Sequence, residues 1–372
     1  MDNTYDIPVA MIVYKRPDLT KKVFEKIREV HPEKLYIISD GPKNAEEALK
    51  VNEVRDYLEH AVDWECEVHK NYAEKNMGIR YRMPSGMEWI FGTEDRAVFI
   101  EDDVMPTKEF FRFCRDMLIK YENDPDVAMI SGTNFAPEDK SFGEYDICFS
   151  YFSSIWGWAT WKRAFEGFDI NMKSWPEVRK KGAIRDIFSS KGYGFYKWMF
   201  DDLQFQWYRS WAYIWAYHRY VKHMRGIVPK YNLVGNAGMN DADAEHPGDT
   251  ESRVEYIENL KKGTFGEKIL CPSSTKANRE YDRMYQDRHL PKAPGLFMRI
   301  KYMIRTPANR RAYLTICEME KDTDYMEKVL SADKKLSPEE SKLNGGALYR
   351  QLSGKEMRKD ASEYRKYRKE HR

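Results

Sequence analysis

Unbroken apolar runs of four to six residues recur along the first third of the chain, and the segments between them have a helical apolar period. Runs of this length are typical of strands buried on both faces of a sheet. They predict strands over residues 9–14, 35–39, 97–100 and 127–131, with further strands over 64–71 and 226–234. The intervening pattern predicts helices over residues 19–30, 45–61, 83–91 and 108–121.

The alternation of strand and helix patterns indicates an α/β fold. We predict a doubly wound, mostly parallel sheet flanked by helices. From residue 151 to about 220 the sequence is aromatic-rich and predicts a mainly helical subregion, which holds eight of the ten tryptophans. The basic, charged sequence of residues 291–372 predicts a helical or partly disordered C-terminal extension.

The composition narrows the class of protein. The 372 residues include 62 Lys and Arg and 60 Asp and Glu, so a net charge of +2 gives no reason to expect a nucleic-acid partner. The five cysteines are scattered and never form C-x-x-C, which argues against a disulfide framework and a thiolate zinc site. No run reaches the ~20 apolar residues that a bilayer span needs, and the first twenty residues lack a signal-peptide pattern. These features predict a cytoplasmic protein.

Three adjacent carboxylates, Glu101, Asp102 and Asp103, directly follow the third apolar run. In open α/β sheets ligands bind at the carboxyl ends of the strands. Adjacent anions there raise each other's pKa unless a cation neutralises them, and a hard divalent ion with a substrate diphosphate would do so. The alternative is a solvated turn at the start of the next helix, where negative charge is favourable, although Thr107 is better placed as the helix cap.

Seven segments occur in an order and at spacings that resemble bacterial glycosyltransferases of the GT-A fold, in a family similar to the inverting N-acetylglucosaminyltransferases and to family 2-like enzymes. The resemblance covers roughly residues 5–250. The segments that carry it are PVAMIVYKRPDLT, ISDGPKN, KNMGIRYRMPSGMEWIF, EDD, WGWATWKRAF, FDD and NLVGNAG. Each segment alone is a weak signal, and their combination is the specific one.

The resemblance implies that Asp103 binds Mn²⁺ or Mg²⁺ directly, while Glu101 and Asp102 lean toward the nucleotide. The usual pattern in such enzymes is Asp-x-Asp, and here a glutamate leads. His246 occupies the place where some relatives supply a second contact to the metal or the diphosphate. For this residue, a solvent-exposed loop histidine is an equally weighted alternative.

The resemblance also implies a nucleotide site. Tyr14, Arg16 and Asp40 would hold the base and the ribose, and Asp40 could equally be a turn residue in an Asp-Gly-Pro sequence. A second group would contact the ribose and the diphosphate, because arginine offers the forked donors that phosphate oxygens favour. This group is Asn76, Arg80 and Arg82. Its alternative is an exposed basic start of a helix.

Sugar transfer needs a base for the proton of the acceptor hydroxyl. In the resembling enzymes this base is the second acid of an aromatic-flanked Asp-Asp pair, which points to Asp202, with Asp201 as a cap or a substrate contact. The alternative is a helix N-cap, because the sequence becomes apolar directly afterwards. Trp156, Trp158 and Trp161 are candidates for stacking on sugar rings, and plain core packing is their alternative.

These features predict a metal-dependent glycosyltransferase that moves a sugar from a nucleotide diphosphate donor to a glycan or lipid-linked acceptor. The predicted division is a nucleotide-sugar half over 1–135, an acceptor and catalytic half over 136–290, and the extension. Residues 297–311 are basic and weakly amphipathic, which allows a peripheral membrane contact. One rival is a sugar nucleotidyltransferase, although the loop after the first strand lacks glycine. The other rival is a catalytically silent binding scaffold.

Overall fold

The computed structural model describes residues 4–137, 139–204, 210–238, 263–290 and 354–371, together with residues 311, 312, 315, 319 and 322. The chain forms two compact units. The first consists of Met1–Ile170, Ile184–Ser189 and Trp215–Leu290, and the second of Asn171–Ala183, Ser190–Ile214 and Pro291–Arg372.

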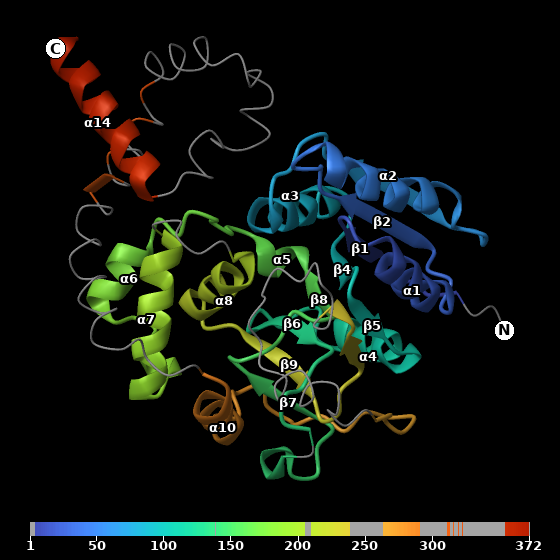
Figure 1. The fold of residues 1–372 in the computed structure, drawn as a ribbon. Coiled ribbons are helices and arrows are strands. Elements are labelled where there is room, and N and C mark those ends of the chain that lie inside the picture. The colour runs from blue at the N-terminus through green and yellow to red at the C-terminus, as the bar shows by residue number, and fades with distance from the viewer. Residues whose placement is uncertain are drawn as a thin grey trace. The chain divides into compact units, whose positions relative to one another are not determined.

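The first unit is built on a single large sheet with helices on both sides (Figure 1). Its strands are β1 (Val9–Val13), β2 (Lys34–Ser39), β3 (Glu67–Tyr72), β4 (Arg96–Glu101), β6 (Val127–Ser131), β7 (Ile147–Ser150), β8 (Trp158–Trp161) and β9 (Arg225–Pro229). Two further strands, β5 (Val104–Pro106) and β10 (Val234–Asn236), form a separate antiparallel pair. Five of the six predicted strands match an observed strand, but the stretch 226–234 is not one strand. It is divided between β9, which ends at Pro229, and β10, which begins at Val234.

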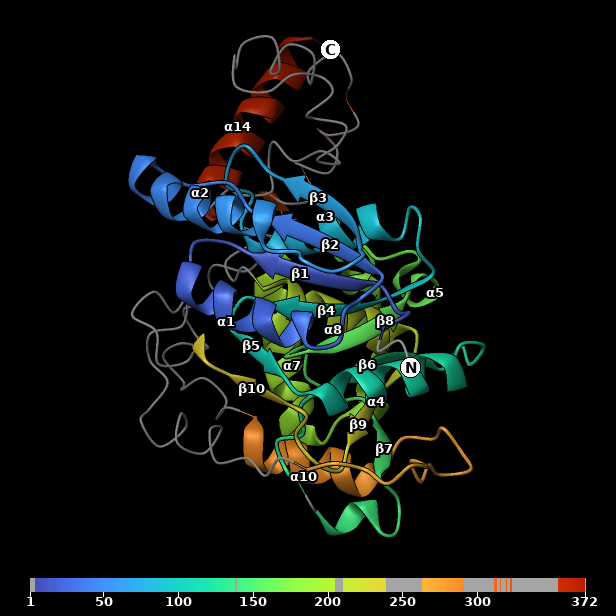
Figure 2. The ribbon, with the colours of Figure 1, turned by 90° about the vertical axis from the view of Figure 1, so that its right-hand side faces the viewer.

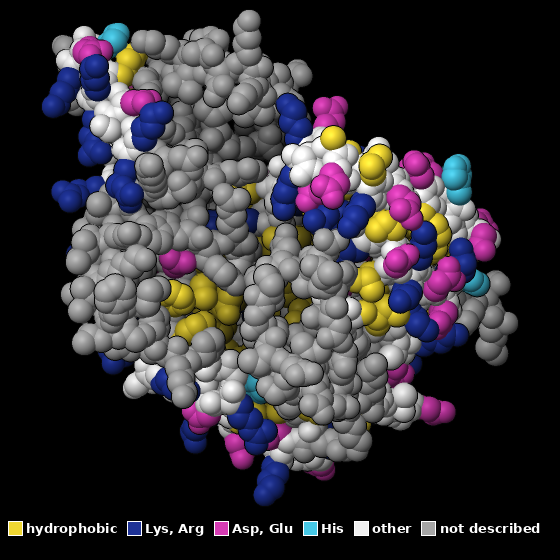
Figure 3. All heavy atoms as spheres, viewed as in Figure 1, with side chains coloured by type: hydrophobic (Ala, Val, Ile, Leu, Met, Phe, Trp, Pro, Cys, Tyr) yellow, Lys and Arg dark blue, Asp and Glu magenta, His cyan; other side chains and the backbone are white. Residues whose placement is uncertain are grey.

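The helices between these strands are also close to their predicted positions. They are α1 (Pro17–Arg28), α2 (Ala45–His60), α3 (Ile79–Ile90) and α4 (Lys108–Lys120). The single turn α5 (Lys162–Phe165) lies in the region predicted only as mainly helical. In Figure 1, α1 and α4 lie on one side of the sheet and α3 lies on the other. Acidic and basic side chains are interspersed over the surface of α1 and α2 (Figure 3), where Lys21 and Glu53 form a 3.0 Å ion pair. None of the helices among the described residues is long and apolar enough to cross a bilayer.

The sheet is mostly parallel, as predicted. Its strands follow in the order β3-β2-β1-β4-β8-β6-β9-β7, which Figure 2 shows from one edge to the other. Only β7 and β8 run against the rest. The chain moves outward from β1 through β2 to β3 and then returns to place β4 on the other side of β1. This reversal makes the carboxyl ends of β1 and β4 a topological switch point, the usual ligand crevice of such sheets.

The aromatic-rich region is mainly helical, as predicted, but it also contains a strand that the sequence did not indicate, β8 (Trp158–Trp161), which lies inside the sheet. Trp158 is fully buried and stacks on Phe99 of β4 with ring centroids 4.9 Å apart. On the opposite face of the strand, the indole nitrogen of Trp161 donates to the backbone oxygen of Leu118 at 3.1 Å. These two tryptophans are core residues, so their predicted role in sugar stacking is wrong.

The remaining elements are helical. They are α6 (Trp175–Lys181), α7 (Ser190–Gln204), α8 (Trp211–Val221), α10 (Arg279–His289) and α14 (Gly354–Glu370), with 3₁₀ turns η1 (Lys140–Phe142) and η2 (Arg185–Ile187). Helix α14 lies within the predicted C-terminal extension. The predicted membrane-contacting stretch, residues 297–311, lies outside the described residues except at its last position.

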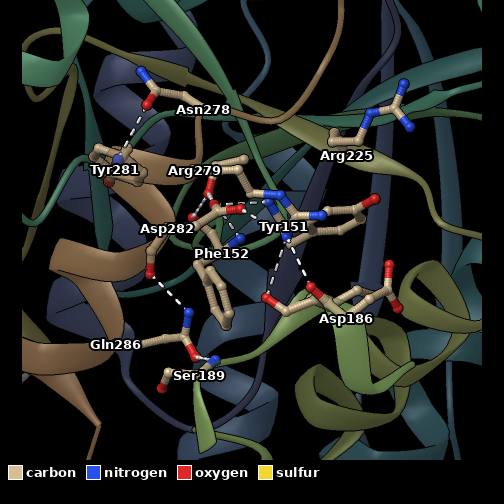
Figure 4. Close-up of polar contacts among 12 residues, drawn as sticks. Tyr151, Phe152, Asp186, Ser189, Arg225, Asn278, Arg279, Tyr281, Asp282 and Gln286 are labelled. Carbon is tan, nitrogen blue, oxygen red and sulfur yellow. Dashed lines mark hydrogen bonds and ion pairs between the residues drawn. The ribbon is translucent and has the colours of Figure 1, made fainter. Parts of the chain in front are cut away.

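A buried carboxylate fastens α10 to the end of strand β7 (Figure 4). Asp282 accepts hydrogen bonds from the hydroxyl of Ser150 at 2.6 Å and from the backbone nitrogen of Tyr151 at 3.3 Å. Its second oxygen has no hydrogen-bond partner among the described residues and lies 3.9 Å from Arg279. Burial raises the pKa of Asp282 to about 7, against the lowering effect of Ser150 and of the arginines Arg279 and Arg219.

This buried acid predicts a pH dependence of stability. The folded chain keeps the Asp282 proton between about pH 4 and pH 7, where the unfolded chain releases it. Stability therefore falls as pH rises through that window, by an order of a few kcal/mol. We expect Asp282→Asn to remove this part of the fall, as measured by urea unfolding at pH 5 and pH 8. Asp287→Asn, an exposed acid on the same helix, is the control. A difference between wild type and Asp282→Asn that stays constant with pH would contradict the prediction.

Candidate functional site

The acidic motif and the loop after β1 meet at the switch point of the sheet. Strands β1 and β4 are paired in parallel with Ile12 opposite Glu101, so the residues that follow each strand emerge side by side. The backbone nitrogen of Tyr14 donates to Asp102 at 3.1 Å. The guanidinium of Arg16 bonds to Asp103 at 2.9 Å and lies 3.5 Å from Asp102. The structure thus brings four predicted site residues together at the end of β4, whose last residue is Glu101. The four are Tyr14, Arg16, Asp102 and Asp103.

The two aspartates have different environments. Asp102 is buried, and this burial together with the neighbouring charge of Asp103 raises its pKa to about 7, although Arg16 and the Tyr14 amide act in the opposite direction. Asp103 is partly exposed. Asp102 is therefore held inside the protein by its hydrogen bonds. Asp103 is the more accessible of the two carboxylates.

The acids do not form the start of a helix. They are followed by strand β5, and α4 begins only at Lys108, where the Thr107 side chain accepts a bond from the amide of Phe110. Asp102 and Asp103 do form a turn, between β4 and β5, but this turn is not the start of α4. The alternative interpretation is therefore right about the turn and wrong about the helix start, which Thr107 caps.

A glycine closes one side of the acidic motif. Strand β10 pairs with β5, and the amide of Ala237 donates to the backbone oxygen of Asp103 at 2.8 Å. A Cβ atom on Gly238 would clash with the carboxylate of Asp103, so any larger residue there would displace that side chain. The sequence NLVGNAG, recognised only as part of the resemblance, therefore has a definite steric role beside the acids.

Asp40 lies at the end of β2 and is fully engaged with the protein. Its carboxylate accepts bonds of 2.8 Å from the amides of Gly41, Met77 and Gly78 and one of 3.1 Å from the side chain of Asn76. Burial raises its pKa, although the three amides lower it. Asp40 and Asn76 therefore hold the loop that precedes α3. The Asp-Gly-Pro sequence itself is irregular backbone, so the turn alternative is not observed for Asp40. The role of both residues in nucleotide contact stays a prediction.

Arg80 and Arg82, in the first turn of α3, are both buried, so the alternative of an exposed basic helix start is wrong. Arg80 donates to the backbone oxygen of Ile170 at 3.2 Å. Arg82 donates to the backbone and side-chain oxygens of Asn71, the latter at 2.8 Å. Burial lowers the pKa of Arg82 to about 10. Its Nε has no hydrogen-bond partner among the described residues, and contact with a diphosphate stays a prediction.

Tyr14 belongs to a polar cluster that the sequence did not reveal. Its hydroxyl donates to Glu47 of α2, which also accepts bonds of 2.9 Å from the Lys15 ammonium and the Lys43 amide. The ammonium groups of Lys15 and Lys43 lie 5.9 Å and 5.8 Å from the centre of the Tyr14 ring. Burial raises the pKa of Glu47, but the bonds from Tyr14 and Lys15 outweigh it and bring that pKa to about 2. Two lysine ammonium groups thus lie near the ring of Tyr14, the residue whose backbone nitrogen donates to Asp102.

Asp201 and Asp202 lie in the last turn of α7, in the second unit. Because α7 begins at Ser190, the helix N-cap alternative is wrong for both. Asp201 is buried, accepts a 2.8 Å bond from the indole of Trp175 and pairs with Arg179 at 3.2 Å. Asp202 is half-buried. The contacts of Asp201 hold its carboxylate inside the second unit.

Trp156 is the tryptophan of the WGWATW segment that is not buried in the core. It is half-buried, precedes Gly157 with its left-handed φ of 57°, and packs edge-on against Phe135 with ring centroids 5.3 Å apart. Phe135 also lies 6.3 Å from Tyr285 and 5.7 Å from His289 of α10. Trp156 therefore keeps its predicted candidacy for contact with a sugar.

Of the two predicted metal-binding residues, Asp103 and His246, the structure describes only Asp103. His246 lies outside the described residues. Among the residues that the structure describes, no three His, Cys, Asp or Glu side chains are grouped so that they could hold a metal ion.

Comparisons with known proteins give distant structural likenesses. No protein-family model and no curated protein matches the chain. A mannosyltransferase from Pyrobaculum calidifontis, in complex with GDP-Man and Mn²⁺, is 14% identical with a TM-score of 0.33, over 55% of this chain and 63% of that one. The galactosyltransferase LgtC, with donor and acceptor sugar analogs, is 12% identical with a TM-score of 0.31, over 70% of this chain and 98% of that one.

A UDP-glucose pyrophosphorylase complexed with UDP-glucose is 10% identical with a TM-score of 0.31, over 61% of this chain and 93% of that one. With 63% of its length covered, the mannosyltransferase is matched over less than two thirds of its own chain. Likenesses at these TM-scores are too distant to carry an activity from those proteins to this one.

Proposed function

We propose that this chain is a metal-dependent glycosyltransferase of the GT-A type, which transfers a sugar from a nucleotide diphosphate donor to a hydroxyl of a glycan or lipid-linked glycan, with inversion. The proposal rests chiefly on one observation. At the switch point of a doubly wound sheet, the partly exposed carboxylate of Asp103 stands beside Arg16, with the buried Asp102 behind them.

The residues present fit a divalent metal. Mg²⁺ is usually held by one or two carboxylates together with the phosphate oxygens of a substrate, and it needs no all-protein cage. Asp103 supplies such a carboxylate, and His246 is the predicted second contact. When bound there, Mn²⁺ or Mg²⁺ would neutralise the charge that develops on the diphosphate as the sugar departs.

The chain's own residues divide the remaining tasks. Arg16 and Lys15, held by Asp103 and Glu47, offer cationic donors for the diphosphate and the ribose. Asp40 fixes the loop that starts α3, and with it the positions of Arg80 and Arg82. Tyr14, Asn76, Glu101 and Asp102 complete the proposed nucleotide site. Asp202 is the proposed base for the acceptor hydroxyl, and Asp201 supports it.

The division of labour along the chain follows from these roles. Residues 1–135 would hold the nucleotide sugar, residues 136–290 the acceptor, and residues 291–372 would form an extension that could contact the inner face of a membrane. A cytoplasmic location is part of the same proposal. The glycine-free loop after β1, with Tyr14, Lys15 and Arg16, speaks against the sugar nucleotidyltransferase alternative, which would cradle a triphosphate there.

The test is a panel of UDP-, GDP- and dTDP-sugars in thermal unfolding and donor hydrolysis, each with Mn²⁺ or with EDTA. A donor at 100 times its dissociation constant stabilises the folded chain by about 2.7 kcal/mol. We expect one donor class to raise the melting temperature by several degrees with Mn²⁺ only. Nucleoside triphosphates with sugar 1-phosphates serve as the control set. Stabilisation and pyrophosphate release with that set, and none with any nucleotide sugar, would contradict the proposal.

A further inference from the structure

Arg16 stands at the start of a helix, but its side chain contacts a strand end and does not cap that helix. It is the N-cap of α1, and its side chain makes no capping bond to that helix. The guanidinium instead reaches the end of β4, where it bonds to Asp103 at 2.9 Å and approaches Asp102 at 3.5 Å. Pro17 at the first helical position and strand β1 before it fix the backbone from which this side chain extends.

The ion pair is shielded from water on both sides. The side chain of Arg16 is 14% exposed, that of Asp103 is 20% exposed, and that of Asp102 is 9% exposed. Charges that are buried to this degree are screened much less by salt than surface pairs. The guanidinium of Arg16 therefore lies against both adjacent carboxylates and bonds directly to Oδ2 of Asp103.

We propose that Arg16 is a built-in counter-ion that competes with divalent cations for Asp103 and turns to the donor's diphosphate when the donor binds. The inference rests on the proposed function, because it takes Asp103 as the metal-binding carboxylate. A guanidinium and a divalent cation cannot share one carboxylate oxygen without strong mutual repulsion. The diphosphate oxygens offer Arg16 an alternative partner of matching forked geometry. Metal binding without nucleotide is therefore weak, and binding of metal and nucleotide together is favoured.

The proposal makes two predictions of opposite sign for one substitution. Arg16→Gln removes the competing charge, so affinity for Mn²⁺ alone should rise by about tenfold, the scale on which an adjacent charge changes a carboxylate's affinity for a cation. The same variant loses a diphosphate contact, so affinity for UDP or GDP in the presence of Mn²⁺ should fall by about tenfold. A residue that only stabilised the loop would not move the two affinities in opposite directions.

The experiment measures Mn²⁺ binding to the full chain by electron paramagnetic resonance, without nucleotide and with UDP or GDP. It compares wild type with Arg16→Gln, Asp103→Asn and a matched control, Arg115→Gln. Arg115 is bonded to Asp6 at 2.6 Å and 2.9 Å, so its replacement removes one positive charge and one ion pair away from the acidic motif. If Arg16→Gln does not fold, Arg16→Met carries the same comparison, because it also removes the positive charge and keeps a long unbranched side chain.

Tighter Mn²⁺ binding in Arg16→Gln, with Arg115→Gln unchanged and Asp103→Asn weakened, supports the proposal. Unchanged or weaker Mn²⁺ binding in Arg16→Gln, with Asp103→Asn still weakened, overturns it and leaves the metal-site assignment standing. Wild-type Mn²⁺ affinity in Asp103→Asn, with and without nucleotide, overturns the metal assignment itself and this inference with it.

Discussion

Replacing Asp202 by asparagine should slow sugar transfer by about 10²-fold or more, which is the usual scale for losing a positioned acid or base. The amide has nearly the same shape as the carboxylate but cannot accept the proton of the acceptor hydroxyl. Affinity for the donor should be nearly unchanged, because Asp202 has no proposed role in holding the nucleotide. Single-turnover rates and calorimetric donor titration measure the two quantities separately.

Asp201→Asn is the natural comparison, because it changes the adjacent carboxylate in the same turn of α7. Asp201 accepts the indole bond of Trp175 and pairs with Arg179, so we expect this variant to lose about 1 kcal/mol of stability. Its loss of rate should be smaller than that of Asp202→Asn. The opposite ranking of the two rates would mean that Asp201 is the base, and full activity in both variants would remove the segment from the catalytic site.

The sheet could be predicted because its strands are buried on both faces. An unbroken apolar run such as 97–100 needs no knowledge of its neighbours to be recognised as a buried strand. Strand β8 could not be recognised in the same way. Its four residues, Trp158–Trp161, become a strand through pairing with β4 on one side and β6 on the other, and those partners are distant in the sequence. Rich aromatic content had suggested helix instead.

The part of the candidate site that the sequence predicts consists of charged residues that directly follow a buried strand. Arg16 and Asp103 each follow an apolar run, and the carboxyl ends of parallel strands lie at one edge of the sheet. Their direct pairing was not expected, because it depends on the order in which β1 and β4 are placed. The same limit applies to Glu47, which lies 33 residues from the Tyr14 hydroxyl that it holds.

Asp40 shows a second kind of limit. The residue type and its place after β2 predict a ligand for a ribose, and in the structure the carboxylate accepts hydrogen bonds from three backbone amides and one side chain. Backbone donors carry no sequence signal, so the saturation of a carboxylate by them cannot be foreseen from residue types. Asp102 differs in that Arg16, a side chain visible in the sequence, balances part of its charge.

Asp103→Asn should abolish metal-dependent donor binding while the chain stays folded. A hard divalent cation is held by charged oxygens, and an amide of similar shape supplies a much poorer ligand. Because Arg16 keeps Asp102 at 3.5 Å, the guanidinium retains a carboxylate partner, so the melting temperature should change little. Calorimetric titration measures the affinity for the donor in Mn²⁺ and in EDTA. The wild type should bind the donor tightly in Mn²⁺ and weakly in EDTA, and Asp103→Asn should bind it weakly in both.

Asp102→Asn is the matched control for this prediction, since it changes the neighbouring carboxylate, which is buried and accepts the amide of Tyr14. We expect it to keep a difference between Mn²⁺ and EDTA, because Asp103 remains, and to change thermal stability more than Asp103→Asn does. If Asp103→Asn binds the donor as tightly as the wild type in Mn²⁺, and Asp102→Asn alone loses the metal effect, the metal ligand is Asp102. If both variants keep the full metal effect, the divalent ion does not bind at this strand end.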